Sequence, residues 1–157
     1  MILKLLLMLF SFTFLKISYS QDSILYSSVK PFKENSIYGT LGAGYVSGIT
    51  GNYERMIFYP IDSKIQSVGF RLGAGPGVSV FVSYMQYISA LTVLTGKGNN
   101  HFEFGAGADF IKEKYYDWQI VPIVNLGYRF QKPGGDYVFR TGTGFPELLY
   151  LSLGFCF

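Results

Sequence analysis

The sequence predicts an all-β fold, an eight-stranded antiparallel up-and-down transmembrane β-barrel, and three observations carry this prediction. The last ten residues alternate between large apolar side chains and smaller or more polar ones, the period of a β-strand with one apolar face. The chain ends on an aromatic residue, Phe157, and it opens with an apolar stretch of the kind that directs export. Together these features are typical of a protein that is exported and inserted into an outer membrane.

Residues 1–20 have the character of a cleaved secretory signal. Lys4 precedes an apolar stretch that is too short for a confident membrane-spanning helix. The small residues Ser18 and Ser20 occupy the positions that signal peptidase reads. We therefore expect cleavage before Gln21, and because Gln21 is not a cysteine, no lipid anchor is expected there.

Charge and cysteine content exclude several classes of protein. Removing Lys4 and Lys16 from the 13 basic residues leaves 11 against 10 acidic ones, so the 137 residues after the signal carry a formal charge of +1. A nucleic-acid partner is not expected, because binding normally needs a concentrated basic patch. The single cysteine, Cys156, excludes an intrachain disulfide framework and a multi-cysteine zinc site, and we expect it to fill space as a small apolar residue.

We expect a polar periplasmic segment at 21–36 and one barrel domain at 37–157. Each expected strand is close to the length that a tilted strand needs to cross a bilayer. The eight segments are 37–46, 52–61, 66–75, 83–95, 101–111, 119–131, 137–145 and 148–157.

The connections predict which end of the barrel faces the periplasm. Residues 96–100 and 132–136 are compact, glycine-containing turns after the fourth and sixth strands, where a barrel with both termini in the periplasm places its short turns. Residues 112–118 are charged and aromatic and are expected to form an external loop. The apolar character continues through 76–82, so the sequence does not define the third connection.

Charged residues and glycines share one face of the expected strands, and large apolar residues occupy the other. This pattern is typical of a lipid-facing exterior around a polar, crowded lumen, whereas a soluble lipocalin-like barrel would place its bulky apolar residues inside. By strand parity Glu103 points into the lumen near the periplasmic end of the fifth strand. Arg129 and Arg140 also point inward near the same end of the next two strands, so we expect Glu103 to pair with both. The expected lumen cluster consists of Glu103, Arg129, Arg140, Arg71 and Asp109.

Aromatic residues gather on the outward faces at the end that carries the two compact turns, as an interfacial girdle would. They are Phe102, Phe104, Tyr128, Phe130, Tyr137, Phe139, Phe155 and Phe157. The expected partners are outer-membrane lipid and the barrel-insertion machinery, which would read Phe157, Phe155 and Leu153 as the insertion signal. Two other folds are alternatives to the barrel: a soluble β-sandwich with an aromatic core, and a transmembrane helix through 78–94.

No pattern of catalytic, cofactor-binding or metal-binding residues is found. Gly42-Ala43-Gly44 lacks the spacing and the following Lys-Ser/Thr of a phosphate-binding loop. His101, the only histidine, shares a face with Glu103 and so could form an acid/base pair, as in outer-membrane lipid A deacylases. Those enzymes use a serine, but this chain has Glu103 two residues after the histidine, so we expect both residues to pack in the lumen.

Several runs resemble a family of small outer-membrane β-barrel proteins of Gram-negative bacteria, the Bacteroidota in particular. The resemblance rests mainly on residues 125–133, 139–142 and 146–154, and it extends to 52–55 and 96–105. It implies a fold and a location in the cell outer membrane, and it carries no general catalytic motif or ligand.

We therefore expect an integral outer-membrane barrel with a structural or surface-interaction role, not an enzyme, without a cofactor. A general diffusion pore is not expected, because side chains fill the lumen of so narrow a barrel. An outer-membrane lipid-modifying enzyme and a very narrow channel are the alternatives. The sequence does not identify a partner for the surface loops.

Overall fold

The structure is a computed structural model, and it describes residues 32–58, 64–79, 82–96, 98–113 and 117–157. The expected signal at 1–20 lies outside the described residues, as does most of the expected N-terminal segment at 21–36.

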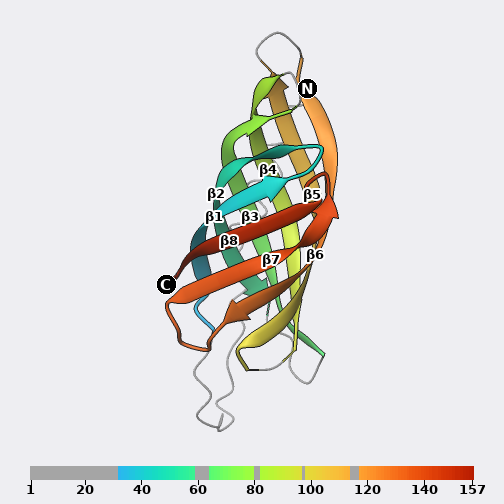
Figure 1. The fold of residues 1–157 in the computed structure, drawn as a ribbon. Helices are drawn as coiled ribbons and strands as arrows, with labels where there is room; N and C mark the ends of the chain where they lie inside the picture. The colour runs from blue at the N-terminus through green and yellow to red at the C-terminus, as the bar shows by residue number, and fades with distance from the viewer. Residues whose placement is uncertain (1–31, 59–63, 80–81, 97, 114–116) are drawn as a thin grey trace, which may run out of the picture.

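The described chain forms a closed antiparallel barrel in which each strand pairs with its neighbours in sequence and the last pairs with the first (Figure 1). The strands are β1 (Asn35–Ala43), β2 (Ser47–Phe58), β3 (Ile65–Val78), β4 (Ser83–Thr95), β5 (Asn100–Glu113), β6 (Gln119–Gln131), β7 (Tyr137–Phe145) and β8 (Leu149–Cys156). The prediction of an all-β, eight-stranded, up-and-down barrel is confirmed. A two-layer sandwich is wrong, because pairing of β8 with β1 closes the sheet.

Strand boundaries differ from the sequence prediction mainly around the first and third connections. β1 ends at Ala43, three residues earlier than predicted, and β2 begins at Ser47, five residues earlier. Side-chain periodicity misses the start of β2 because Gly48 and Gly51 interrupt it, yet their backbones continue the ladder with β1. β3 continues to Val78 through the apolar stretch that obscured its end.

The alternative of a helix through 78–94 is wrong, because β4 runs through most of that segment. In the part of the chain that the structure describes, no helix has the length and apolar character needed to cross a membrane.

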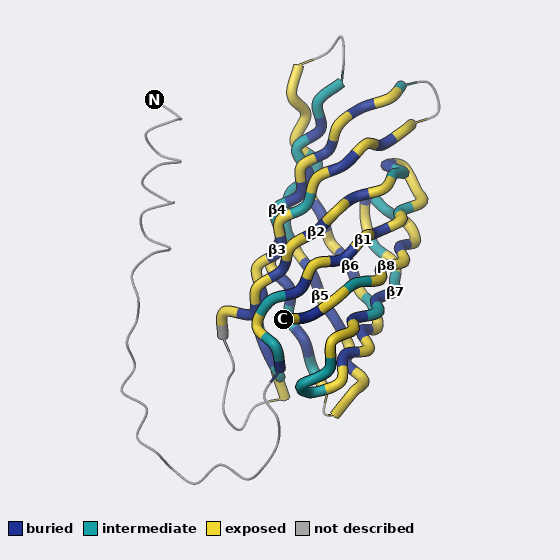
Figure 2. The backbone as a smooth tube through the Cα atoms, turned by 90° about the vertical axis from the view of Figure 1, so that its left-hand side faces the viewer, coloured by how far each residue is buried: buried dark blue, intermediate teal, exposed yellow. Residues whose placement is uncertain are grey.

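Buried and exposed residues alternate along the strands, as the alternating colours of the tube show (Figure 2). The outward positions carry large apolar side chains that are exposed, among them Ile37, Ile49, Phe70, Leu91, Phe104, Leu126 and Leu153. Of the eight aromatic residues expected in a girdle, seven are exposed, and Phe139 is partly buried. Many of the charged and amide side chains on these strands point inward and are buried, whereas Arg55 on β2 is exposed.

The barrel has two distinct ends. The end we call lower is where β4, β6 and β8 end, with the turn at 132–136 and the C-terminus, and the upper end is where β1, β3, β5 and β7 end (Figure 1). At the lower end Asn35 and Phe157 exchange backbone hydrogen bonds of 3.2 and 2.9 Å, which ties the last residue to β1. Gly96 and Gly98 adopt positive φ angles of 97° and 76° in the tight turn before β5, a conformation that glycine tolerates best.

Candidate functional site: a charge network inside the barrel

Two glutamates and two arginines meet inside the barrel, and we call these four residues the charge network. They are Glu54 on β2, Glu103 on β5, Arg129 on β6 and Arg140 on β7. All four side chains have 0% exposure. Each occupies an inward position of its strand, so the period of the strands directs the charges into the lumen.

Arg140 and Glu103 form a bidentate pair. Arg140 Nε donates to Glu103 Oε2 at 2.9 Å and to Oε1 at 3.1 Å, and Arg140 Nη2 also donates to Oε1. Arg129 Nη1 lies 3.5 Å from Glu103 Oε2. The β6–β7 register explains the arrangement, because it sets Arg129 directly opposite Arg140, so both guanidinium groups reach one carboxylate. The structure thus brings together three of the five residues expected in the lumen cluster.

Glu54 is the second acceptor of the network. Its Oε1 accepts hydrogen bonds of 2.7 Å from Arg129 Nη1 and from Thr92 Oγ1, and its Oε2 accepts one of 2.8 Å from the Tyr38 hydroxyl. The Arg140 guanidinium stacks over the Tyr38 ring at 4.5 Å from its centroid. Tyr38 therefore joins both ion pairs, one through its hydroxyl group and the other through its ring.

Sequence reasoning missed Glu54, Tyr38 and Thr92. The signal for Glu54 was present, because it lies within the predicted second strand between two residues that face outward, Tyr53 and Arg55. Applying the same parity to that strand as to the fifth would have placed Glu54 in the lumen. Tyr38 carried no such signal, since a tyrosine in a barrel strand can face the outer surface as well as the lumen.

Arg71 and Asp109 face the lumen but lie apart from the charge network. Arg71 Nε donates to Asn52 Oδ1 at 2.8 Å, and Asn52 in turn donates to Thr40 Oγ1 at 3.0 Å. Asp109 is 2% exposed and lies nearer the upper end. Among the residues that the structure describes, no salt bridge joins it to an arginine.

Apolar layers lie above and below the charges. Val46, Tyr84 and Ile111 pack together at the upper end, with Val121 against them. Ile88, Ala90 and Ile123 form a second layer beneath these residues. At the lower end Val138 and Cys156 pack with Tyr38, which confirms Cys156 as a buried residue of the lumen.

The residues before β1 cover the lower end. The Phe32 ring packs edge-on against His101, with 5.0 Å between the ring centroids, and both residues are buried. Lys33 Nζ donates to Asp136 Oδ1 at 2.5 Å and to the Cys156 carbonyl at 3.3 Å. The lysine hydrogen bond and charge lower the pKa of Asp136 below its ordinary value. We call this interaction of Lys33 with Asp136 the lower clamp.

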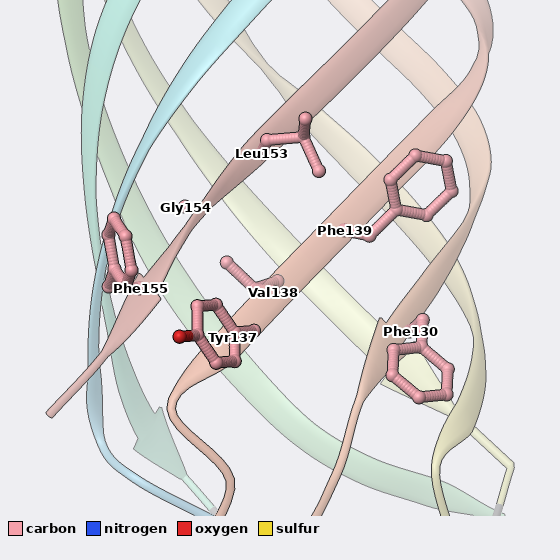
Figure 3. A pocket seen from close by; sticks show the side chains of 7 residues that line it. All are labelled: Phe130, Tyr137, Val138, Phe139, Leu153, Gly154 and Phe155. Atoms are coloured by element: carbon pink, nitrogen blue, oxygen red, sulfur yellow. The ribbon is translucent and has the colours of Figure 1, made fainter.

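The residues expected to form the insertion signal lie on the outer surface. Leu153, Phe155 and Phe157 are exposed, and Phe155 packs against Tyr137 with ring centroids 5.4 Å apart. A shallow groove of about 310 Å³ crosses this part of the surface. Figure 3 shows its lining: Phe130, Tyr137, Val138, Phe139, Leu153, Gly154 and Phe155, from β6, β7 and β8.

Chemically, the charge network suits cross-linking of strands better than reaction with a substrate. Its carboxylates already accept charge-assisted hydrogen bonds, and Phe32 covers His101. Within the described ranges, no group of three or more His, Cys, Asp or Glu residues is arranged to hold a metal ion. Comparisons of the chain with protein-family models, with curated proteins and with solved structures found no match.

Proposed function

We propose that this protein is an integral outer-membrane β-barrel with a structural or surface-interaction role, and that it is neither a general diffusion pore nor an enzyme. One observation carries the proposal: the barrel is apolar outside and charged inside. Leu153 is 63% exposed, whereas Arg129 and Glu103 are inaccessible.

A bilayer explains this distribution by transfer free energy. Contiguous apolar surface is rare on soluble monomers beyond a few hundred Å², and here it surrounds the barrel over all eight strands. Exposing the same apolar side chains to hydrocarbon carries no such penalty. The closed sheet has no edge strand, so the backbone hydrogen bonds of every strand are satisfied. The aromatic residues at the lower end suit an interface with lipid headgroups.

The packing of the lumen argues against the two alternative functions. A narrow channel needs an open path, but packed side chains fill the lumen. Ile88 and Ile111 are buried above the charge network, and Phe32 covers the lower end. A lipid-modifying enzyme needs an accessible acid/base group facing the lipid. His101 instead points into the lumen, where it is 1% exposed.

The resemblance to small outer-membrane barrels of Gram-negative bacteria agrees with this proposal and remains part of it. Export would use the N-terminal signal. Assembly would bring the chain to the barrel-insertion machinery, with Phe157, Phe155 and Leu153 as the recognised strand end. Lipid then contacts the outer surface, including the groove of Figure 3.

Fractionation of a Gram-negative host that expresses the chain tests this location directly. We expect the mature protein in the outer-membrane fraction, with faster gel mobility before boiling than after it, because a closed barrel stays compact in detergent. A single mobility and recovery in the soluble periplasmic fraction would contradict the proposal.

A further inference from the structure

Three oxygen-bearing side chains gather at the upper end of the lumen without taking part in the charge network. Gln86 on β4 is 0% exposed, and neither its amide oxygen nor its amide nitrogen has a hydrogen-bond partner. Asp109 on β5 is 2% exposed, and its Oδ1 is likewise unpartnered. Glu147 reaches toward them from the connection between β7 and β8. Buried polar atoms without partners in a native fold call for a ligand or an ordered solvent molecule.

The strand register brings Gln86 and Asp109 together. Asp109 lies directly opposite Ile88, and Gln86 lies two residues before Ile88 on the same strand. Such diagonal neighbours on one face of a sheet lie about 7–8 Å apart and are within reach of longer side chains.

A pair of glycines gives Glu147 and Gln86 a common space. Gly42 and Gly48 lie directly opposite each other on β1 and β2, and both face inward. A Cβ atom on Gly42 would lie 2.6 Å from Glu147 Oε1, and one on Gly48 would lie 2.8 Å from Gln86 Nε2. Because directly opposed Cβ positions are about 5 Å apart, the carboxylate and the amide converge over this pair.

The charges around these side chains leave one negative charge unmatched. Arg71 interacts electrostatically with both Asp109 and Glu147, so one cation serves two carboxylates. Arg140 also acts on Glu147, but it already forms the bidentate pair with Glu103. A bound cation would restore the balance.

We propose that Asp109, Glu147 and the amide oxygen of Gln86 bind a divalent cation, Ca²⁺ in preference to softer metals, at the upper end of the barrel. Carboxylate and amide oxygens are hard ligands of the kind that Ca²⁺ takes, and water completes its coordination. With only two carboxylates and Arg71 nearby, the affinity belongs to the weak range of extracellular calcium modules, about 10⁻⁴–10⁻³ M. The site joins the β7–β8 connection to β4 and β5, so binding would fasten the upper end of the barrel.

Calorimetric titration of Ca²⁺ into the full chain, refolded in detergent micelles and freed of metal with a chelator, tests the site. We expect one saturable event near the millimolar range, and a higher Tm in excess Ca²⁺ than with the chelator. Asp109→Asn and Glu147→Gln should each weaken binding by about tenfold or more, because each removes a charged ligand. Glu34→Gln is the matched control, since its carboxylate is 57% exposed at the opposite end of the barrel.

A gain-of-function variant keeps the test decisive if a loss variant fails to fold. Gln86→Glu supplies a third carboxylate, so the rise in Tm caused by Ca²⁺ should be larger than in the unaltered chain. No saturable binding of Ca²⁺ up to about ten times the expected dissociation constant would overturn the proposal. Equal binding by the unaltered chain, Asp109→Asn and Glu147→Gln would also overturn it. Neither result bears on the membrane location, which fractionation tests separately.

Discussion

Arg140 Nε lies 2.9 Å from Glu103 Oε2, and neither side chain is exposed to solvent. Taking both charges out of water costs several kcal/mol for each ion, and the bidentate geometry must offset that cost. The contribution of the pair to stability is therefore tested best by removing one partner and keeping the other. The pair also links β5 to β7 past the intervening β6, so it fixes the relative position of two strands that are not neighbours in the sheet.

Glu103→Ala should destabilise the barrel strongly, by about 3–5 kcal/mol, because it leaves two buried arginines facing each other without their shared carboxylate. Urea unfolding in lipid vesicles measures the change. Glu34→Ala serves as the control and should cost little, since surface ion pairs contribute about 0–1 kcal/mol. The double variant Glu103→Leu with Arg140→Met should be more stable than either single change. If both single changes cost no more than Glu34→Ala, the network does not hold the strands together.

Glu54→Gln isolates the charge of the second carboxylate while keeping its shape. The amide oxygen can still accept from Tyr38 or Thr92, but Arg129 then has only Glu103 as a counter-ion. We expect a loss of about 1.5–3 kcal/mol, the range for a hydrogen bond to a charged group. The same unfolding measurement gives the change, and a loss below that of Thr92→Val would contradict the central role of Glu54.

The number and order of the strands, and the direction in which their side chains point, could be predicted from the sequence because they depend on local periodicity. The fifth strand illustrates this: Phe102 and Phe104 alternate with Glu103 and Gly105, and the structure exposes the first two and buries the others. Period-two alternation is a property of neighbouring residues, so it needs no knowledge of the other strands.

The contacts within the lumen depend on more than periodicity. Glu54 meets Arg129, 75 positions away, because the barrel closes and brings β2 and β6 across the lumen from each other. Inward parity limits which residues can meet, but the stagger of the strands decides which ones do. Arg71 shows the difference, since its parity was predicted and its partner, Asn52, was not.

Leu153→Arg distinguishes a bilayer from water as the medium around the barrel. On a lipid-facing surface the change should cost about 2–4 kcal/mol near the midplane and less toward an interface. On a water-facing surface it should stay within about 0.5 kcal/mol. Refolding into lipid vesicles measures the difference, with Leu153→Met as the apolar control. Equal stability of the two variants in vesicles would mean that Leu153 does not face lipid.

Phe157→Asp tests the insertion signal without shortening the chain. The backbone hydrogen bonds of residue 157 with Asn35 can still form, so the substitution changes only the side chain at the strand end. We expect less protein in the outer membrane and more in the periplasm, measured by fractionation at low expression. Phe157→Tyr keeps the aromatic ring and should assemble normally. An unchanged yield of Phe157→Asp would show that this side chain is not read during assembly.

The lower clamp should respond to acid. The pKa of Asp136 is lowered in the folded protein by its hydrogen bond with Lys33, so the clamp stabilises the docked N-terminal segment above the ordinary pKa of an aspartate. That contribution is lost as the pH falls through the lowered pKa, where the carboxylate takes up a proton. Docking of Phe32 over His101 should therefore weaken only in acid and stay constant around neutral pH.

Phe32→Trp in a Trp118→Phe background reports this docking by fluorescence, because Trp118 is the only tryptophan of the chain. We expect blue-shifted emission at neutral pH and a shift to the red below the ordinary range of aspartate, about pH 4. Adding Asp136→Asn should produce the red-shifted emission already at neutral pH, since Lys33 then lacks its charged partner. If the asparagine variant titrates like its parent, a group other than Asp136 controls the docking of the segment, and the clamp contributes nothing to it.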